Sequence, residues 1–320
     1  MQFWEQTPEN IWQGRDDSAE SPSAKRIFQT VQQASVFAPE KYPNHIALMG
    51  FMCDKGVELN KGRVGAATAP NIIRQGMANF ADHEATKPLV DLGNVIFQGD
   101  SLPAVQAAFA EHITACHQNG LPTLVFGGGH ETAYAHAKGL YDAYPDARIG
   151  IINFDAHLDV RKANTASSGT PFKQLAEECQ NSNRPFNYLC VGVSRASNTK
   201  ALLDTANELN VKIIWDTECT EGNIANLNNQ VNAFLADLDV VYLTIDLDAL
   251  PFAEMFAVSA PSTLGVRTQI YLILAETIIS SNKLKAVDLV EYNPSLDRDM
   301  LCAKTAARIA WHIYNSWANN

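Results

Sequence analysis

Two aspartates and a histidine occupy alternate positions in a short segment that could bind a metal ion. Asp155, His157 and Asp159 follow directly after the apolar run Ile149–Phe154. If the backbone stays extended, all three side chains project to one side. Two carboxylates and an imidazole on one face are costly to keep together unless a cation lies among them. The alternative is a solvated loop in which an aspartate caps a turn.

A second acidic pair with the same spacing follows another apolar run. Asp246 and Asp248 come at the end of Val240–Ile245. Alone, such a pair is a weak signal, because aspartate is common in turns and at helix caps. In an open α/β sheet, however, ligands gather beyond the carboxyl ends of the strands. Two acidic clusters at the ends of two strands therefore favour a shared metal site.

A triple glycine followed by a histidine ends a third apolar run. Gly127–Gly129 follow Thr123–Phe126, and His130 comes next, at the start of a predicted helix. Glycines let the backbone turn tightly and approach a ligand closely. The segment lacks the Lys-Ser/Thr pair of a P-loop and the spacing of a dinucleotide-binding turn, which disfavours a nucleotide site. A core histidine is the alternative interpretation of His130.

Together, these segments supply four carboxylates, two imidazoles and no thiolate. That set of donors favours Mn²⁺ over zinc. It suits two metal ions about 3.5–4 Å apart that share a carboxylate and a bridging hydroxide, which is a nucleophile near neutral pH. The sequence therefore predicts metal-assisted hydrolysis. The predicted ligands are His130, Asp155, His157, Asp159, Asp246 and Asp248.

A sheet covered by helices must position these residues. After Pro43, apolar runs of strand length alternate with longer amphipathic segments. Continuous rather than alternating apolar runs are typical of strands buried on both faces, so we expect an α/β fold with a mainly parallel sheet between helices. The predicted strands are Ile46–Phe51, Thr123–Phe126, Ile149–Phe154, Tyr188–Val193, Lys212–Trp215, Val240–Ile245 and Ala286–Val290. The predicted helices are Pro70–Phe80, Leu102–His117, Thr132–Ala143, Lys200–Leu209, Asn223–Leu238, Thr268–Ser281 and Leu296–Trp317.

The first part of the chain differs in character from the rest. Residues 1–40 are polar and interrupted by prolines, which predicts an extended N-terminal arm or a loose helix. Trp4 and Trp12 could anchor this arm on the domain or at a subunit contact. No repeat or linker interrupts the alternation further on, so residues 41–320 are predicted to form one domain.

Composition excludes several classes of function. Of 320 residues, 24 are Lys or Arg and 35 are Asp or Glu, a net charge of −11. This balance argues against nucleic acid and anionic lipid as partners. No apolar stretch reaches the roughly 20 residues that span a bilayer, and no signal peptide is recognisable. The six cysteines are scattered without a CxxC pair, as in a cytoplasmic protein with reduced thiols.

The three motifs resemble those of the ureohydrolase (arginase–agmatinase) family. GGGHE at Gly127–Glu131, DAHLD at Asp155–Asp159 and TIDLD at Thr244–Asp248 correspond to GGDHS, DAHxD and SxDxD in that family. The similarity extends from about Ile46 to the C-terminus. Within the family, the chain is most similar to the formimidoylglutamases of histidine degradation. The segments that carry this closer similarity are Trp12–Asp17, Gly56–Ala66 and Val258–Pro261.

The resemblance implies a three-layer αβα sandwich, often assembled as trimers or hexamers, with two Mn²⁺ ions per subunit. It also implies that Asp159 relays a proton from the bridging hydroxide to the departing amine. The implied ligands are His130, Asp155, Asp159 and Asp246 for one ion, and Asp155, His157, Asp246 and Asp248 for the other.

The chain departs from the arginases where the substrate would bind. Counted without gaps, Arg161 and Phe172 stand where arginases have an Asn and a proton-shuttle His, while Ser168 and Gly169 match the family's Ser-Gly. After the next strand, where arginases hold the substrate's α-ammonium with acidic groups, this chain has Arg195. A bidentate arginine suits a substrate that carries carboxylates and no free ammonium.

N-formimidoylglutamate is such a substrate, with two carboxylates and a blocked amino nitrogen. Arg161, Ser168 and Arg195 are therefore predicted to bind it, although either arginine could instead cap a surface carbonyl or pair with an aspartate. Glu291 resembles the family's glutamate that holds the guanidinium, and could orient a planar amidinium. The alternative is that Glu291 is an acid near a helix N-terminus.

The resemblance implies a dimanganese hydrolase that converts N-formimidoyl-L-glutamate and water to L-glutamate and formamide. A related enzyme that acts on a guanidino compound, such as an agmatinase or a guanidinobutyrase, is the first alternative. A metal-binding relative without catalysis is the second, because Phe172 stands where arginases have the shuttle histidine. We expect a cytoplasmic protein that binds a small anionic molecule and that could assemble as a homo-oligomer.

Overall fold

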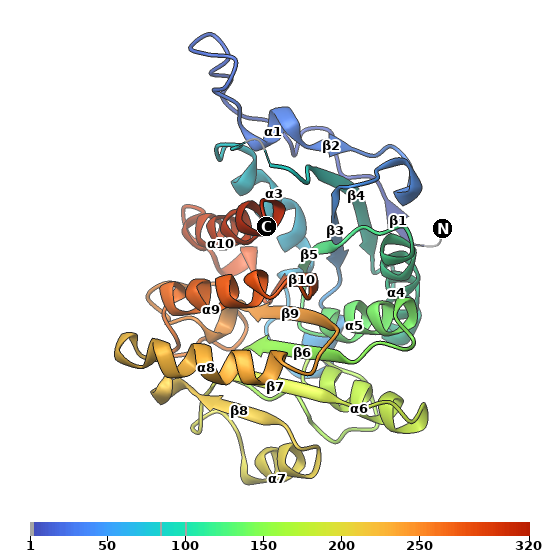
Figure 1. The fold of residues 1–320 in the computed structure, drawn as a ribbon, viewed down its shortest axis with the longest axis vertical. Coiled ribbons are helices and arrows are strands. Elements are labelled where there is room, and N and C mark those ends of the chain that lie inside the picture. Colours follow the sequence, from blue (N-terminus) through green and yellow to red (C-terminus); the bar gives the residue numbers. More distant parts are fainter. Residues whose placement is uncertain (1–2, 84, 100) are drawn as a thin grey trace.

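One twisted sheet runs through the computed structural model, which describes residues 3–83, 85–99 and 101–320 (Figure 1). Its strands are β1 (Trp4–Glu5), β2 (Gln32–Gln33), β3 (Ile46–Met52), β4 (Leu89–Ile96), β5 (Thr123–Gly127), β6 (Ile149–Phe154), β7 (Asn187–Val193), β8 (Lys212–Trp215), β9 (Val240–Asp246) and β10 (Leu284–Val290). The order in space is β1-β4-β3-β5-β10-β9-β6-β7-β8, and β2 also pairs with β4. β1 lies antiparallel to β4, whereas the other named strand pairs are parallel. The predicted α/β fold is confirmed.

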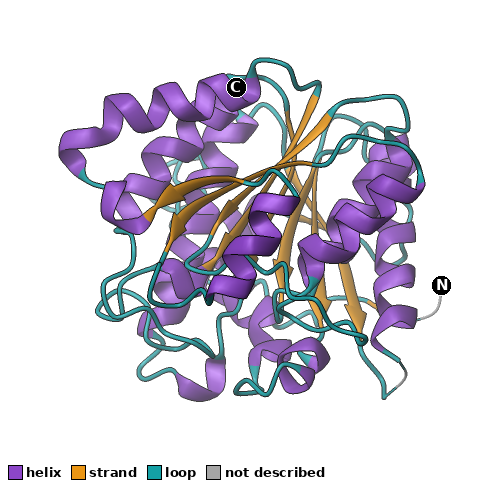
Figure 2. Cartoon of the chain, turned by 90° about the horizontal axis from the view of Figure 1, so that it is seen from below, coloured by secondary structure: helices purple, strands orange, loops and turns teal. Residues whose placement is uncertain are grey.

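Helices cover both faces of the sheet, so the molecule has three layers (Figures 1 and 2). They are α1 (Ile27–Thr30), α2 (Lys55–Leu59), α3 (Ala69–Ala78), α4 (Leu102–Gln118), α5 (Thr132–Ala143), α6 (Pro171–Asn181), α7 (Lys200–Glu208), α8 (Ile224–Leu235), α9 (Thr268–Ser280) and α10 (Leu301–Ala318). α3, α10, α9 and α8 pack in that order on one face, and α4, α5 and α6 pack on the other. In the described part of the chain, no helix has the length and apolarity needed to cross a membrane.

Apolar cores fill both spaces between the sheet and its helices. On β5, Leu124 belongs to the cluster beneath α3 and α10, while the next residue, Val125, belongs to the cluster beneath α4. On β9, Leu243 likewise belongs to the cluster beneath α3 and α10, while the preceding residue, Tyr242, belongs to a cluster on the opposite face. Successive side chains on a strand point to opposite faces, so a strand buried on both sides is apolar throughout. This is why these strands were recognisable as continuous apolar runs.

Six of the named strands and helices were not predicted, and one helix begins later than expected. β1, β2 and α1 lie in the segment that was predicted only as an arm or a loose helix, and α2 has only five residues. β4 was missed because Asp91, Gly93 and Asn94 interrupt its apolar run. α6 was missed although its buried positions have helical spacing. α10 begins at Leu301 rather than at Leu296, because Pro294–Leu296 form a separate 3₁₀ turn and the two residues before α10 have positive φ angles.

The two tryptophans of the N-terminal segment contact the rest of the molecule at β4. The indole of Trp4 donates a hydrogen bond of 2.7 Å to the carbonyl oxygen of Leu92, and that of Trp12 donates one of 2.7 Å to Asp91 Oδ2. Both anchor the segment on the domain. The fully buried guanidinium of Arg74 binds the other oxygen of Asp91 at 2.9 Å. The division between residues 1–40 and 41–320 stays a prediction.

We expect Asp91→Asn to destabilise the fold strongly. The substitution keeps the shape of the side chain but leaves the buried charge of Arg74 without its ionised partner, which costs about 3–5 kcal/mol. Urea denaturation measures the free energy of unfolding. Asp204→Asn, which breaks an exposed pair with Lys200 on α7, is the control and should cost less than about 1 kcal/mol. Equal losses in the two variants would contradict the prediction.

Candidate metal centre

Four neighbouring strands end at the same edge of the sheet and bring the predicted ligands together. β5, β10, β9 and β6 are adjacent and parallel, although they lie far apart in the sequence. Residues at their carboxyl ends are in register: Val290 lies opposite Asp246, and Phe154 lies opposite Ile245. The segments that follow these strands must therefore converge.

The turn after β5 needs its glycines in order to place His130. A Cβ atom on Gly128 would lie 2.0 Å from the carbonyl oxygen of Cys53, and the Gly129 amide donates a hydrogen bond to that same oxygen at 3.0 Å. His130 follows, 1% exposed, with its Nε2 atom 3.1 Å from Thr244 Oγ1 on β9. This contact turns the Nδ1 atom of His130 towards the acidic cluster.

The first cluster surrounds His130. Its Nδ1 atom lies 3.0 Å from Asp159 Oδ2 and 3.1 Å from Asp246 Oδ2. The same atom lies 3.3 Å from Asp155 Oδ2. These atoms come from three different strand ends, as the sequence predicted. The ligand atoms of His130, Asp155 and Asp159 all lie within 4.8 Å of one another, which is close enough for one cation to bind them.

The second cluster surrounds His157 and shares Asp155 with the first. His157 Nδ1 lies 3.4 Å from Asp155 Oδ1 and 3.4 Å from Asp248 Oδ2. The two oxygens of Asp155 thus face different imidazoles. The oxygen Asp246 Oδ1 accepts a hydrogen bond from the amide of Asp248 at 2.8 Å. All six predicted ligands lie together, and Asp155 is placed between the two clusters.

The polar atoms of this site fit a divalent cation. Among the described residues, His130 Nδ1 and Asp248 Oδ1 are buried without a hydrogen-bond partner of suitable geometry. Burial raises the pKa of Asp248 to about 6, although the neighbouring His157 lowers it. Burial and the charges of Asp248 and Asp155 raise the pKa of Asp246 well above its ordinary value. Protons therefore compete for oxygens that a cation would bind, and oxygen-rich ligands with a minority of imidazole suit Mn²⁺.

The backbone is strained at two of the predicted catalytic residues. Asp159 and Glu291 have φ angles of 48° and 68°, in the left-handed region that non-glycine residues rarely adopt. Such strain concentrates at functional sites, where the surrounding structure imposes it. The carboxylate of Glu291, 5% exposed, accepts a hydrogen bond of 2.8 Å from the amide of His130. Burial, together with the charges of Asp246 and Glu131, raises its pKa well above the ordinary value.

Arg161 and Ser168 lie on one loop beside the metal centre. The amide of Arg161 donates to the carbonyl oxygen of Gly169 at 3.0 Å, and its side chain crosses that glycine so closely that a Cβ there would lie 2.8 Å from the Arg161 Cδ atom. Ser168 is buried, and its hydroxyl accepts a hydrogen bond from Asn60 at 3.2 Å. The arginine itself is exposed.

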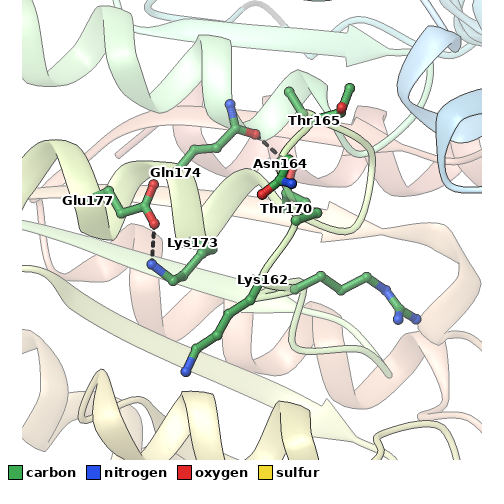
Figure 3. A pocket seen from close by; sticks show the side chains of 10 residues that line it. Lys162, Asn164, Thr165, Thr170, Lys173, Gln174 and Glu177 are labelled. Atoms are coloured by element: carbon green, nitrogen blue, oxygen red, sulfur yellow. Dashed lines mark hydrogen bonds and ion pairs between the residues drawn. The ribbon is translucent and has the colours of Figure 1, made fainter.

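Arg161 also lines a hollow of about 520 Å³ between its loop and α6 (Figure 3). In Figure 3, Gln174 points towards Thr170, and Lys173 pairs with Glu177 on the same helix. Lys162 from the loop pairs with Glu208 on α7. The lysines of this hollow are thus neutralised by glutamates, whereas no side-chain partner of Arg161 is found in the described part of the chain.

Arg195 lies outside the cluster of metal-ligand candidates. Its guanidinium stacks over the ring of Trp215 on β8, with 3.6 Å between the guanidinium carbon and the ring centroid. This contact is neither the surface carbonyl nor the aspartate considered as alternatives from the sequence. Arg63, which was not included among the predicted site residues, binds the carbonyl oxygens of Val258 and Ser259 and so links two loops.

Phe172 packs behind the metal centre. Its ring is fully buried, lies edge-on to the His130 ring at 5.5 Å between centroids, and stacks on Tyr188 at 4.4 Å.

Sequence reasoning missed two other residues that support the site, Thr244 and Asn198. The Asn198 side chain bonds to Leu158 N and Ala156 O and thereby ties the segment after β6 to the segment after β7. The only sequence signal for these supporting roles was that a polar residue lies near a strand end, for Thr244, or in a loop, for Asn198.

Comparison with known proteins gives a consistent result. A sequence model of the Arginase family matches residues 44–315. A formimidoylglutamase of Enterobacter sp. (strain 638) is 51% identical over 318 residues, which cover 99% of this chain and 100% of the relative. A formimidoylglutamase of Photorhabdus laumondii is 48% identical over 317 residues, again covering 99% of this chain and all of the relative.

Solved structures share the fold. The crystal structure of formimidoylglutamase from Bacillus subtilis superimposes with a TM-score of 0.81 at 20% identity, covering 96% of this chain and 94% of that chain. Formiminoglutamase from Trypanosoma cruzi with Mn²⁺ superimposes with a TM-score of 0.79 at 22% identity, covering 92% and 99%. At these identities the likeness concerns the fold alone.

We expect Mn²⁺ to stabilise the chelator-treated protein against heat. A ligand that binds only the folded state adds about 2.7 kcal/mol when its free concentration is 100 times the dissociation constant. Asp155→Asn should abolish most of the rise in melting temperature, since Asp155 contacts both clusters. Asp142→Asn, an exposed residue on α5 paired with Lys138, is the control and should keep the rise. A wild-type protein whose melting temperature ignores Mn²⁺ would contradict the prediction.

Proposed function

Because the chain belongs to the arginase family, we propose that it is a dimanganese hydrolase that converts N-formimidoyl-L-glutamate and water to L-glutamate and formamide. The observation that carries this proposal is the convergence of six metal-ligand candidates at one sheet edge. Relatives named formimidoylglutamase that are about half identical over their whole length support the choice of substrate.

The six residues would hold two Mn²⁺ ions, with His130 and Asp159 on one and His157 and Asp248 on the other. Asp155, which faces both imidazoles, would be shared between them, and we propose the same for Asp246. When bound, two such ions supply a water molecule activated as a nucleophile near neutral pH. The reaction joins the oxygen of water to the amidine carbon and breaks the bond from that carbon to the glutamate nitrogen.

Two carboxylates are proposed to act directly on the substrate. Glu291 lies beside His130 and would orient the planar, cationic amidinium by charge-assisted hydrogen bonds. Asp159 would carry a proton to the departing glutamate nitrogen. Burial raises the pKa of Asp159, although the neighbouring His130 opposes this, so the carboxylate takes up a proton more readily than in water.

Arg161 and Ser168 are proposed to bind carboxylates of the substrate. They share the loop after the metal-binding segment, and the guanidinium of Arg161 is free of side-chain partners among the residues described. Arg195 would join them only after leaving the ring of Trp215. A cytoplasmic location and a homo-oligomeric assembly stay predictions; sedimentation velocity would test the second.

We expect a manganese-loaded preparation to release formamide from N-formimidoylglutamate and little urea from arginine or agmatine. The anionic substrate suits the arginines of this site better than a substrate with a free ammonium. Measuring both products with all three substrates side by side distinguishes the proposal from a guanidino hydrolase. Two bound metal ions without turnover of any of the three would favour a non-catalytic relative instead.

We expect Arg161→Ala and Glu291→Gln to affect different kinetic constants. Loss of a charge-assisted hydrogen bond to a carboxylate should raise KM about 10–100-fold with a smaller change in kcat. Loss of the carboxylate that orients the amidinium should lower kcat about 100-fold. Steady-state formamide release measures both constants. Arg148→Ala, at the opposite end of β6, is the control and should change neither.

A further inference from the structure

A buried asparagine links one metal-ligand candidate to the body of the sheet. Asn153 is fully buried in β6, a strand that is otherwise apolar. Its Nδ2 atom lies 3.0 Å from Asp155 Oδ2 and 3.0 Å from the hydroxyl of Tyr188 on β7. The Tyr188 hydroxyl in turn donates to the carbonyl oxygen of Leu158 at 3.1 Å. Two hydrogen-bonded strands thus hold both a ligand carboxylate and the backbone of the metal-binding segment.

The direction of these hydrogen bonds is determined by their partners. Tyr188 gives its single hydroxyl hydrogen to Leu158, so its oxygen accepts from Asn153. An amide nitrogen carries two hydrogens, one for each partner. The opposite rotamer of Asn153 would direct its oxygen at a carboxylate oxygen, which is repulsive. The amide nitrogen therefore faces Asp155.

Asn153 contacts only one of the two oxygens of Asp155 in this arrangement. The oxygen that it binds, Oδ2, is the one that lies 3.3 Å from His130 Nδ1. The other oxygen, Oδ1, accepts a hydrogen bond of 2.7 Å from the amide of His157 and faces that residue's ring. Each oxygen is thus held from a different side.

We propose that Asn153 is a positioning residue that fixes Asp155 Oδ2 for the ion held by His130, and has little effect on the ion held by His157. This inference rests on the two-metal centre proposed above. The packing strengthens it, because Phe172 stacks on Tyr188 and lies edge-on to His130. The ring of His130 and the hydrogen-bond chain through Asn153 therefore share one rigid support.

The test measures the two ions separately. His157→Ala leaves the ligands of the His130 ion, and His130→Ala leaves those of the His157 ion. Asn153→Leu is added to each background, and Mn²⁺ alone is titrated by calorimetry and by electron paramagnetic resonance. Loss of such a supporting hydrogen bond typically weakens metal binding 10–100-fold. We expect about that loss in the His157→Ala background and less than about threefold in the His130→Ala background.

Two further variants guard against misfolding and general loosening. Tyr188→Phe keeps the ring but removes the acceptor of the second Asn153 hydrogen. It should weaken binding of the ion held by His130 by a smaller factor than Asn153→Leu does. Asn198→Ala removes two hydrogen bonds to the backbone of the same segment, at Ala156 and Leu158, and is the matched control that should produce no difference between backgrounds. Circular dichroism establishes that each variant is folded.

The possible outcomes separate the inference from the function on which it rests. Equal weakening of Mn²⁺ binding in both backgrounds would show that Asn153 only supports the loop, and would overturn the inference while leaving the metal centre intact. Unchanged Mn²⁺ affinity in both backgrounds would also overturn the inference and leave the metal centre intact. If the protein with all six ligand candidates intact binds no Mn²⁺, the metal centre itself is wrong, and the inference is overturned with it.

Discussion

Four carboxylates and two imidazoles share one buried sheet edge, and the need to balance their charges constrains everything around them. Burial would raise the pKa of Asp155, but the rings of His130 and His157 hold it below its ordinary range. Burial and the charges of Asp248 and Asp155 move the pKa of Asp246 the other way. Neighbouring carboxyl groups whose pKa values are shifted in opposite directions cannot all be ionised at once without a compensating positive charge. Divalent cations supply it, which is why a buried arrangement of this kind is intelligible as a metal centre.

The topology of the sheet is what makes this concentration of charge attainable. β10 lies between β5 and β9, so Glu291 emerges beside His130 although 161 positions separate them in the sequence. Where strands give way to loops, Asp159 and Glu291 adopt strained left-handed conformations. Short loops can hold such conformations only because the strands before them are fixed by ladders on both sides. The rigid sheet thus fixes the positions of the few side chains that follow its strands.

The cluster of metal-ligand candidates was predictable from the sequence because each of its residues carries a local signal. Asp155, His157 and Asp159 follow a continuous apolar run with a period of two, which marks both the strand and the point where it ends. The stacking of Arg195 on Trp215 has no such signal, because the tryptophan belongs to a later strand and the contact exists only in three dimensions. β4 was hidden for a related reason: its polar residues are satisfied by Arg74, from a different element.

The residues proposed to bind the substrate and those proposed to bind metal lie on different kinds of structure. The metal-ligand candidates stand at strand ends or shortly after them, whereas Arg161, Ser168 and Gly169 belong to a loop. Arg161 and Gly169 are coupled, since a side chain at position 169 would collide with the stem of the arginine, 2.8 Å away. Replacing this pair would change the charge that the site presents to a substrate without moving a metal ligand. A protein with this fold could therefore change its substrate by changing its loops alone, while the strand ends keep the metal-ligand candidates in place.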